Sequence, residues 1–202
     1  MSHYFDESPD SPLKLYSFKE TLRGRTFEFI SASGVFSAKK VDFGTKLLAD
    51  NMQIRSNDKV LDLGCGIGII GIVASTITKN EVICTDINER ACSIAEKNAE
   101  KINPEAYKSG RIKIKCGDMF SHLKGEKFDV ILLNPPQTAG KKVCFEMIRQ
   151  SKEHLNSNGS LQIVARHNKG GKTLSEKMLE VFGNMTIIAK KGGYRIYMSR
   201  NV

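Results

Sequence analysis

The sequence has no apolar run longer than a single strand, whereas a membrane span needs about 20 apolar residues. Its first sixteen residues, MSHYFDESPDSPLKLY, are partly acidic and have no apolar core, which excludes a secretory signal of the usual kind. Its five cysteines form no CxxC or CxH pair, and its four histidines are scattered. The sequence therefore predicts reduced thiols in a cytoplasmic protein, with no membrane segment and no metal site.

Positive charge dominates the composition, since the formal net charge is +9 over 202 residues. Residues 139–202 alone contain twelve Lys and Arg and four Asp and Glu, a net charge of +8. A basic C-terminal region favours a polyanionic partner such as RNA. A lysine-rich surface that contacts only solvent is the alternative, and charge alone does not decide between them.

The first quarter of the chain differs in pattern from the rest. Residues 1–20 are polar with two Ser-Pro steps, which favours a loosely attached arm. Alternating apolar residues around a glycine in 26–37 predict a short hairpin, and 42–52 has the pattern of a helix. We therefore expect residues 1–55 to lead into one domain formed by residues 56–202.

From residue 59 onward, stretches of strand length alternate with helical patterns. The expected strands are 59–64, 81–86, 111–118, 127–136, 160–166, 185–190 and 194–199. The expected helices are 67–77, 88–102 with Asn88 as its cap, 144–155, and 172–183 ending on Gly183. This alternation predicts a doubly wound α/β fold, with helices on both faces of a mostly parallel sheet. A ligand of such a sheet binds beyond the carboxyl ends of the strands.

Glycines and a carboxylate mark the end of the first expected strand, in DLGCGIG. The spacing is GxGxG, whereas a dinucleotide fingerprint is GxGxxG. Asp62 precedes the first glycine, Gly64, by two residues and would repel a pyrophosphate. It suits the cationic end of a ligand, such as an amino acid moiety.

Two more carboxylates follow the next two strands. Asp86 lies 22 residues beyond Gly64, where an acidic residue can accept both hydroxyls of a ribose. Asp118 could hold the exocyclic amine of an adenine. Each residue alone is more often a cap or turn residue, but together with Asp62 they fit one ligand with an amine, a ribose and an adenine. The predicted cofactor is S-adenosyl-L-methionine.

The run FDVILL ends abruptly at Asn134, Pro135 and Pro136. Two prolines fix the backbone and form a rigid, non-helical corner, so the amide of Asn134 is held at the end of a buried strand. Its side-chain oxygen and the Pro135 carbonyl could each accept one N–H of an aromatic amine. The nitrogen lone pair would then be free to attack a methyl group, and no general base is needed beforehand.

These motifs together resemble the class I S-adenosylmethionine-dependent methyltransferases. Within that class the chain resembles the methyltransferase small domain family, which includes enzymes that methylate guanine N2 in 16S ribosomal RNA. The resemblance covers roughly residues 24 to 200 and rests on SGVFS (33–37), VDFGT (41–45), DLGCGIG, NPP followed by Gly140, and GGYRIY. It implies a Rossmann-like, seven-stranded sheet with one antiparallel strand near the edge.

The resemblance and the motifs predict three groups of site residues. The predicted catalytic residues are Asn134, Pro135 and Pro136. The predicted cofactor-binding residues are Thr45, Asp62, Gly64, Cys65, Gly66, Gly68, Asp86, Ile87, Asp118, Met119 and Asn134. The predicted substrate-binding residues are Phe36, Gln137, Lys141, Lys142 and Arg195. Relatives often have an aromatic residue at the position of Gln137, where it stacks on the target base, so Phe36 or another aromatic residue would replace it.

The favoured function is methylation of an exocyclic amine of an RNA base, most plausibly guanine N2 of small-subunit ribosomal RNA. Phosphate contacts would come from Lys141, Lys142, Lys169, Lys172, Lys190, Lys191 and Arg195. A protein glutamine N-methyltransferase, a DNA adenine methyltransferase and a non-catalytic RNA-binding protein of the same fold are the alternatives. The glycine spacing disfavours an NAD-dependent oxidoreductase. The sequence does not indicate an oligomeric state.

Overall fold

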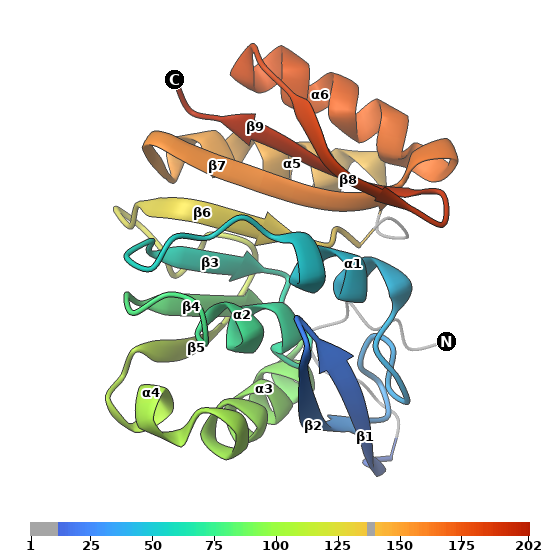
Figure 1. The fold of residues 1–202 in the computed structure, drawn as a ribbon, viewed down its shortest axis with the longest axis vertical. Helices are drawn as coiled ribbons and strands as arrows, with labels where there is room; N and C mark the ends of the chain where they lie inside the picture. Colours follow the sequence, from blue (N-terminus) through green and yellow to red (C-terminus); the bar gives the residue numbers. More distant parts are fainter. Residues whose placement is uncertain (1–11, 137–139) are drawn as a thin grey trace.

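The computed structural model describes residues 12–136 and 140–202. In these ranges the chain forms a two-stranded hairpin and a seven-stranded sheet with helices on both faces (Figure 1). The strands are β1 (Leu15–Leu22), β2 (Arg25–Ala32), β3 (Val60–Leu63), β4 (Val82–Asp86), β5 (Ile112–Cys116), β6 (Phe128–Leu133), β7 (Leu155–Arg166), β8 (Thr186–Lys191) and β9 (Tyr194–Arg200). The helices are α1 (Phe43–Asn51), α2 (Ile69–Ala74), α3 (Glu89–Ile102), α4 (Pro104–Lys108), α5 (Lys141–Glu153) and α6 (Lys172–Phe182), and a wide turn, η2 (His167–Gly171), precedes α6.

The sheet has the strand order β5-β4-β3-β6-β7-β9-β8. Strand β9 pairs antiparallel with both β7 and β8, and the other pairs are parallel. The predicted α/β fold and the antiparallel strand near one edge are confirmed. The strand order reverses between β3 and β6, which is where a ligand binds in open sheets of this kind.

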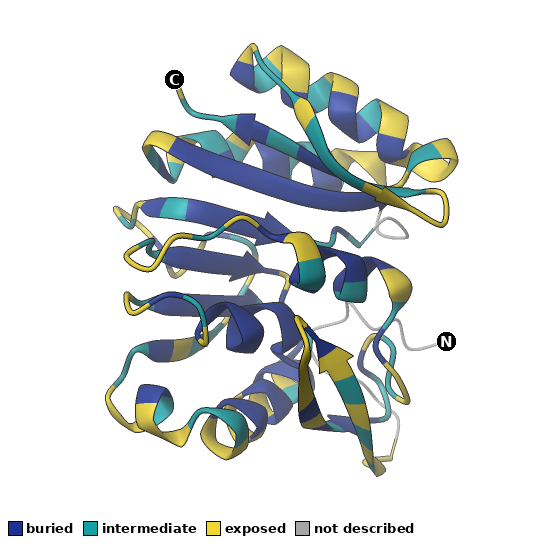
Figure 2. Ribbon diagram, viewed as in Figure 1, coloured by how far each residue is buried: buried dark blue, intermediate teal, exposed yellow. Residues whose placement is uncertain are grey.

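Alternating side chains of the central strands fill two separate cores. Val60 and Val130 belong to one cluster with the hairpin, α1, α2 and α3, whereas Leu61 and Ile131 belong to the other with α5 and α6. Strands β3, β6 and β7 are buried along most of their length (Figure 2). Because both faces are covered, these strands read as nearly continuous apolar runs in the sequence.

The hairpin lies earlier in the chain than predicted. Its strands β1 and β2 are joined at Arg23 and Gly24, whose φ angles of 50° and 76° are left-handed. Residues 15–20 therefore belong to a strand and not to a loose arm, and the predicted hairpin at 26–37 is wrong. Tyr16 and Phe18 alternate with polar residues, and Gly24, not Gly34, lies at the turn.

Two further elements differ from the sequence prediction. Helix α4 was not predicted, although Pro104 at its first turn and Asn103 as its cap are typical of a helix start. Strand β7 begins five residues earlier than expected, because the segment NSNG continues the strand through an irregularity where Asn158 has a φ of 62°. The other predicted helices and strands are confirmed to within a few residues.

Candidate active site

A cavity of about 490 Å³ opens at the carboxyl ends of β3, β4 and β6. This volume lies in the range of small-molecule sites. Of the predicted site residues, those that line it are Phe36, Thr45, Gly64, Cys65, Gly66, Asp86, Ile87, Asp118, Met119, Asn134, Pro135 and Pro136. Parallel topology brings those that follow β3, β4, β5 and β6 together, because every loop that follows a parallel strand emerges at the same edge of the sheet. Phe36 and Thr45 come from the segment before β3.

The glycine-rich turn after β3 is tied to the neighbouring strand. The backbone N–H groups of Gly64 and Cys65 both donate to the carbonyl of Thr85, at 2.8 and 2.9 Å. The N–H of Gly66 donates to Oδ2 of Asp86 at 2.7 Å. Gly64 and Gly66 have left-handed φ angles of 71° and 54°, so a side chain at either position would strain the turn. The turn is therefore a rigid wall of the cavity.

Asp62 and Gly68 do not line the cavity, so their predicted contacts with the cofactor are not supported. Asp62 is 1% exposed, and its Oδ2 accepts the N–H of Gly71 at 2.7 Å. Burial raises the pKa of this carboxyl to about 7, with a smaller contribution from the charge of Asp86. Gly68 caps α2, and a Cβ there would lie 3.1 Å from Cβ of Ala95. Both residues stabilise the glycine-rich turn on the side away from the cavity. Their spacing in the sequence does not show on which side of the turn they lie.

Asp86 and Asp118 stand at the cavity with different surroundings. Asp86 accepts the N–H of Gly66 with one oxygen and the N–H of Asn88 with the other. Burial raises its pKa, and these backbone donors oppose the shift. Each carboxylate oxygen keeps a second lone pair, so Asp86 can still accept hydroxyl donors. Asp118 is exposed beside Met119, whose φ of 43° turns the loop toward the cavity.

The amide of Asn134 has one possible orientation in this structure. Its Nδ2 donates to Oγ1 of Thr45 at 2.9 Å and lies 3.4 Å from both side-chain oxygens of Asp42. Since an ionised carboxylate only accepts hydrogen bonds, the NH₂ group must face Asp42. The Oδ1 atom is consequently left to accept a donor from elsewhere.

Asp42 was not predicted as a site residue, although it belongs to the VDFGT motif. It caps α1, with Oδ1 accepting the N–H groups of Gly44 at 2.9 Å and Thr45 at 3.1 Å. The same carboxylate thus fixes the start of α1 and orients Asn134. An aspartate at the start of a helical pattern is typical of a cap, but the contact with a residue 92 positions away is visible only in the structure.

Tyr194 was also missed as a site residue. It lines the cavity at the start of β9, and its ring centroid lies 5.2 Å from that of Phe43. Among the predicted substrate-binding residues, Arg195, Lys141 and Lys142 do not line the cavity. Arg195 follows Tyr194 in β9, and Lys141 and Lys142 are exposed at the start of α5. Gln137 lies outside the described residues.

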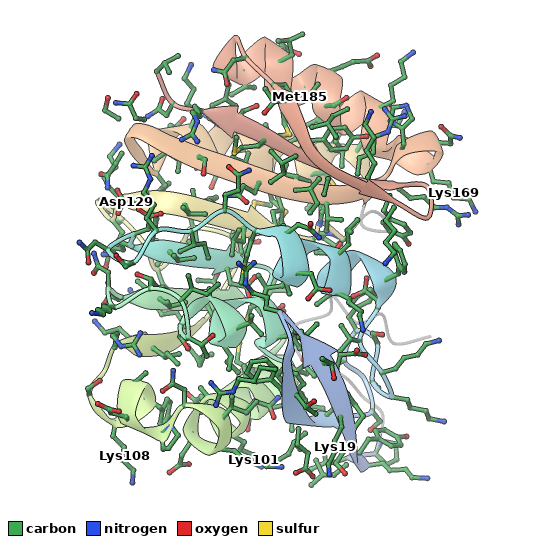
Figure 3. The ribbon with its side chains drawn as sticks, in the orientation of Figure 1. Lys19, Lys101, Lys108, Asp129, Lys169 and Met185 are labelled. Atoms are coloured by element: carbon green, nitrogen blue, oxygen red, sulfur yellow. The ribbon has the colours of Figure 1, made fainter. Side chains whose placement is uncertain are left out.

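A group of basic side chains surrounds η2 and the turn between β8 and β9. We call it the basic rim, and it consists of Lys169, Lys172, Lys190, Lys191 and Arg195. The N–H of His167 donates to the carbonyl of Gly193 at 2.9 Å, which holds the two turns together. Figure 3 shows Lys169 next to the β8–β9 turn. Desolvation and the charges of Arg195, Lys172 and Lys190 lower the pKa of His167. These three cations are therefore all close enough to His167 to affect its charge.

The residues around the cavity fit S-adenosylmethionine, since the glycine turn leaves room for close approach and Asp86 keeps acceptor capacity at the second strand end. Within residues 12–136 and 140–202, no group of three or more His, Cys, Asp or Glu side chains could hold a metal ion. None of the described helices is long and apolar enough to cross a membrane.

Comparison with known proteins identifies similar chains. The family model described as "Methyltransferase small domain" matches residues 26–198. The "Uncharacterized protein YbxB" of Bacillus subtilis (strain 168) is 37% identical over 203 residues, which cover 99% of this chain and 98% of that protein. The "Ribosomal RNA small subunit methyltransferase C" of Haemophilus influenzae (strain 86-028NP) is 33% identical over 209 residues, covering 98% of this chain and 60% of that protein.

A solved structure shares the fold. It is the T. thermophilus 16S rRNA N2 G1207 methyltransferase (RsmC) in complex with AdoMet and guanosine, which superposes with a TM-score of 0.79 at 22% identity. The match covers 96% of this chain and 52% of that structure. The chain thus spans about 60% of the length of the Haemophilus ribosomal RNA methyltransferase it matches and about half of the solved one.

Proposed function

Since the chain belongs to the methyltransferase small domain family of S-adenosylmethionine-dependent methyltransferases, we propose that it methylates an exocyclic amine of an RNA base. The specific target that we propose is N2 of a guanine in small-subunit ribosomal RNA. The observation that carries this proposal is the fixed amide of Asn134, whose NH₂ group is engaged by Thr45 and Asp42. Its carbonyl oxygen, which accepts no hydrogen bond from the residues that the structure describes, is available at the strand end to accept an N–H of the target amine.

In the proposed reaction, Asn134 and Pro135 at the end of β6 activate the target amine. S-adenosylmethionine supplies an electrophilic methyl group when it is bound. Oδ1 of Asn134 and the carbonyl of Pro135 would each accept one N–H of the target amine. The lone pair then leaves conjugation with the ring, and most of the rate gain comes from positioning and charge complementarity. After transfer, the nitrogen releases its proton to solvent.

A neutral amide suits this position better than a carboxylate. An aspartate at 134 would stand about 3.4 Å from the two oxygens of Asp42, and the like charges would repel each other. It would also pair with the cationic sulfur of the cofactor and not with the amine. The rigid Pro135–Pro136 step keeps the acceptors in place.

Two observations support RNA as the substrate. The Haemophilus relative at 33% identity is a small-subunit ribosomal RNA methyltransferase. The basic rim adjoins Tyr194, which lines the cavity, so phosphates near a target base could contact Lys190, Lys191 or Arg195. The cytoplasmic location and the RNA partner both stay predictions.

The experiment measures transfer of a labelled methyl group from S-adenosylmethionine to unmodified small-subunit RNA, both free and assembled into subunits. Label in the RNA, mapped to a guanine N2, is the expected result. Asn134→Ala and Asn134→Asp should lose about 100-fold or more in transfer rate. Asn51→Ala is the matched control, because Asn51 ends α1 and only donates to the carbonyl of Leu47 at 2.9 Å.

Two results would contradict the proposal. A protein that binds the cofactor but labels small-subunit RNA neither free nor in subunits does not methylate the proposed target. Label found on a glutamine side chain of a ribosomal protein would favour the protein-methylating alternative.

A further inference from the structure

The proposed function does not yet say which side chain stacks on the target base, and Tyr194 is a candidate. The target base needs a flat partner on one face, and the residue after the second proline is Gln137, which has no ring. We propose that Tyr194 provides the aromatic face on which the base stacks, and that Gly44 keeps the space beside it open. This inference rests on the proposed function, because it positions the base whose amine Asn134 would hold.

Distances around Gly44 carry the argument. A Cβ atom built on Gly44 would lie 3.4 Å from Oδ1 of Asn134 and 3.4 Å from Cε1 of Tyr194. The acceptor oxygen and the edge of the ring are therefore separated by no more than twice that distance. One base can therefore reach both groups, with its exocyclic amine bonded to the oxygen and its ring in contact with the tyrosine. Both residues line the same cavity.

The glycine itself is otherwise hard to explain. Gly44 lies in the first turn of α1, where glycine is a poor helix former compared with alanine. Its φ angle is not positive, so the backbone does not require glycine here. An added Cβ would lie 3.1 Å from Oδ1 of Asp42, which is tighter than ordinary van der Waals contact. Space between Asp42, Asn134 and Tyr194 is what the glycine provides.

Phe43 packs against the ring of Tyr194. The two ring planes are inclined at 44°, and a Cβ on Gly192 would come within 2.9 Å of Cζ of Phe43. Gly192 and Gly193 have φ angles of 57° and 79°, which make the turn that brings Tyr194 to the cavity. The tight turn and the Phe43 contact fix the ring before any base arrives.

Phe36 is the other aromatic residue at the cavity, and its segment is attached to the opposite side. The carbonyl of Gly34 accepts an N–H of Asn88, and the carbonyl of Ser33 accepts one from Arg90. Asn88 and Arg90 follow β4, beside the predicted ribose site at Asp86. Tyr194 and Asn134 both lie next to Gly44, so we place the target base with Tyr194.

Steady-state kinetics on RNA test this role. Tyr194→Ala should lower kcat/KM for RNA about 10- to 100-fold, the loss expected for one stacked base, and leave cofactor affinity within about twofold. Tyr194→Phe should keep most of the activity, because the ring remains. Tyr107→Ala, in α4 and away from the cavity, is the control and should behave as the parent protein.

A direct measurement of stacking is available because the chain contains no tryptophan. In Tyr194→Trp the indole is the only tryptophan, and guanosine added to the protein saturated with S-adenosylhomocysteine should quench its fluorescence in a saturable manner. Tyr107→Trp should show no saturable change. Gly44→Ala should weaken the quenching when it is added to Tyr194→Trp, and it should weaken methyl transfer when it is made in the parent protein; thermal unfolding of each variant checks that it is folded.

The outcomes separate the two proposals. Normal RNA methylation by Tyr194→Ala, or no guanosine-dependent quenching in Tyr194→Trp, would overturn the role of Tyr194 and leave the proposed function intact. No methylation of RNA by the parent protein would overturn the proposed function. The fluorescence titration would then still decide whether Tyr194 binds a purine.

Discussion

Three aspartates on or behind the wall of the cavity, Asp42, Asp62 and Asp86, have different surroundings. Asp42 accepts from two helix N–H groups and faces the Asn134 amide. Asp62 is buried with one oxygen on Gly71 and the other without a partner among the described residues. Asp86 lines the cavity while both of its oxygens accept backbone donors. Their roles therefore follow from what each carboxylate touches.

Asp42→Asn should reduce methyl transfer about 10- to 100-fold with little change in stability. Asparagine caps a helix about as well as aspartate, so α1 should be retained. An amide can donate as well as accept, however, and it no longer forces the NH₂ group of Asn134 to face it. The effect should fall on kcat, and the Kd of the cofactor should stay within about twofold.

Asp50→Asn is the matched control for this variant, since Asp50 lies in the same helix and accepts the N–H of Arg23 at 2.7 Å. Its kcat should equal that of the parent protein. An unchanged kcat in Asp42→Asn would show that Thr45 alone orients the amide.

Asp62 should make stability depend on pH. Its folded pKa of about 7 lies above the ordinary value of 3.8, so its stabilising contribution is complete below about pH 4 and is lost as pH rises through 7. The shift corresponds to roughly 4 kcal/mol as an upper bound. The free energy of unfolding of Asp62→Asn, relative to that of the parent protein, should therefore be highest at pH 8. Urea unfolding of both proteins at pH 5 and pH 8 measures this, and an equal difference at the two pH values would contradict it.

At the scale of elements, η2 and the β8–β9 turn act as one unit. The bond from His167 to Gly193 joins them, and the basic rim lies on both. A turn carrying several cations close together attracts phosphates. Desolvation lowers the pKa of His167, and the charges of Arg195, Lys172 and Lys190 lower it further. The two turns adjoin Tyr194 and thus the cavity.

Replacing Lys190 and Lys191 together by glutamine should weaken RNA binding and make it less sensitive to salt. If both contact phosphates, the slope of log K against log salt should become shallower by roughly 1.4 for single-stranded RNA. Binding at several salt concentrations gives this slope. The control pair Lys19→Gln and Lys108→Gln removes the same charge toward the other end of the molecule (Figure 3) and should leave the slope nearly unchanged.

At the scale of the whole molecule, the hairpin is part of the folded domain's core. Phe27 and Phe29 belong to the same apolar cluster as Val60 and Ile70. The buried side chain of Asn98 joins three segments, because it accepts the N–H of Ile30 at 2.7 Å and donates to the carbonyls of Ile30 and Ile67. The division at residue 56 remains a prediction, but packing across it is continuous.

Asn98→Ala should destabilise the protein by about 2–5 kcal/mol, because it leaves backbone groups of β2 and the glycine turn without partners. The loss should appear in urea unfolding and as faster hydrogen exchange in β2. Glu96→Ala, at an exposed position of the same helix, should change stability by less than about 0.5 kcal/mol. Equal exchange rates in β2 of both variants would show that Asn98 does not hold the hairpin.

The sequence by itself determined the alternation of strands and helices from β3 to β9, the cap at Asn88 and the end of α6 at Gly183. These features depend on local periodicity and on residues within one turn, which a linear pattern contains. It also determined that Asp86, Asp118 and Asn134 meet, because parallel strands bring their carboxyl ends to one edge.

Only the tertiary structure decided which way these side chains point and what they touch. Asp62 turns inward to Gly71, Asp42 reaches an amide 92 positions away, and Tyr194 arrives at the cavity from the far end of the chain. The packing of β2 against α3, through the bond from Ile30 to Asn98, is likewise visible only in the structure. Such contacts depend on how separate elements pack, and no spacing along the sequence contains that information.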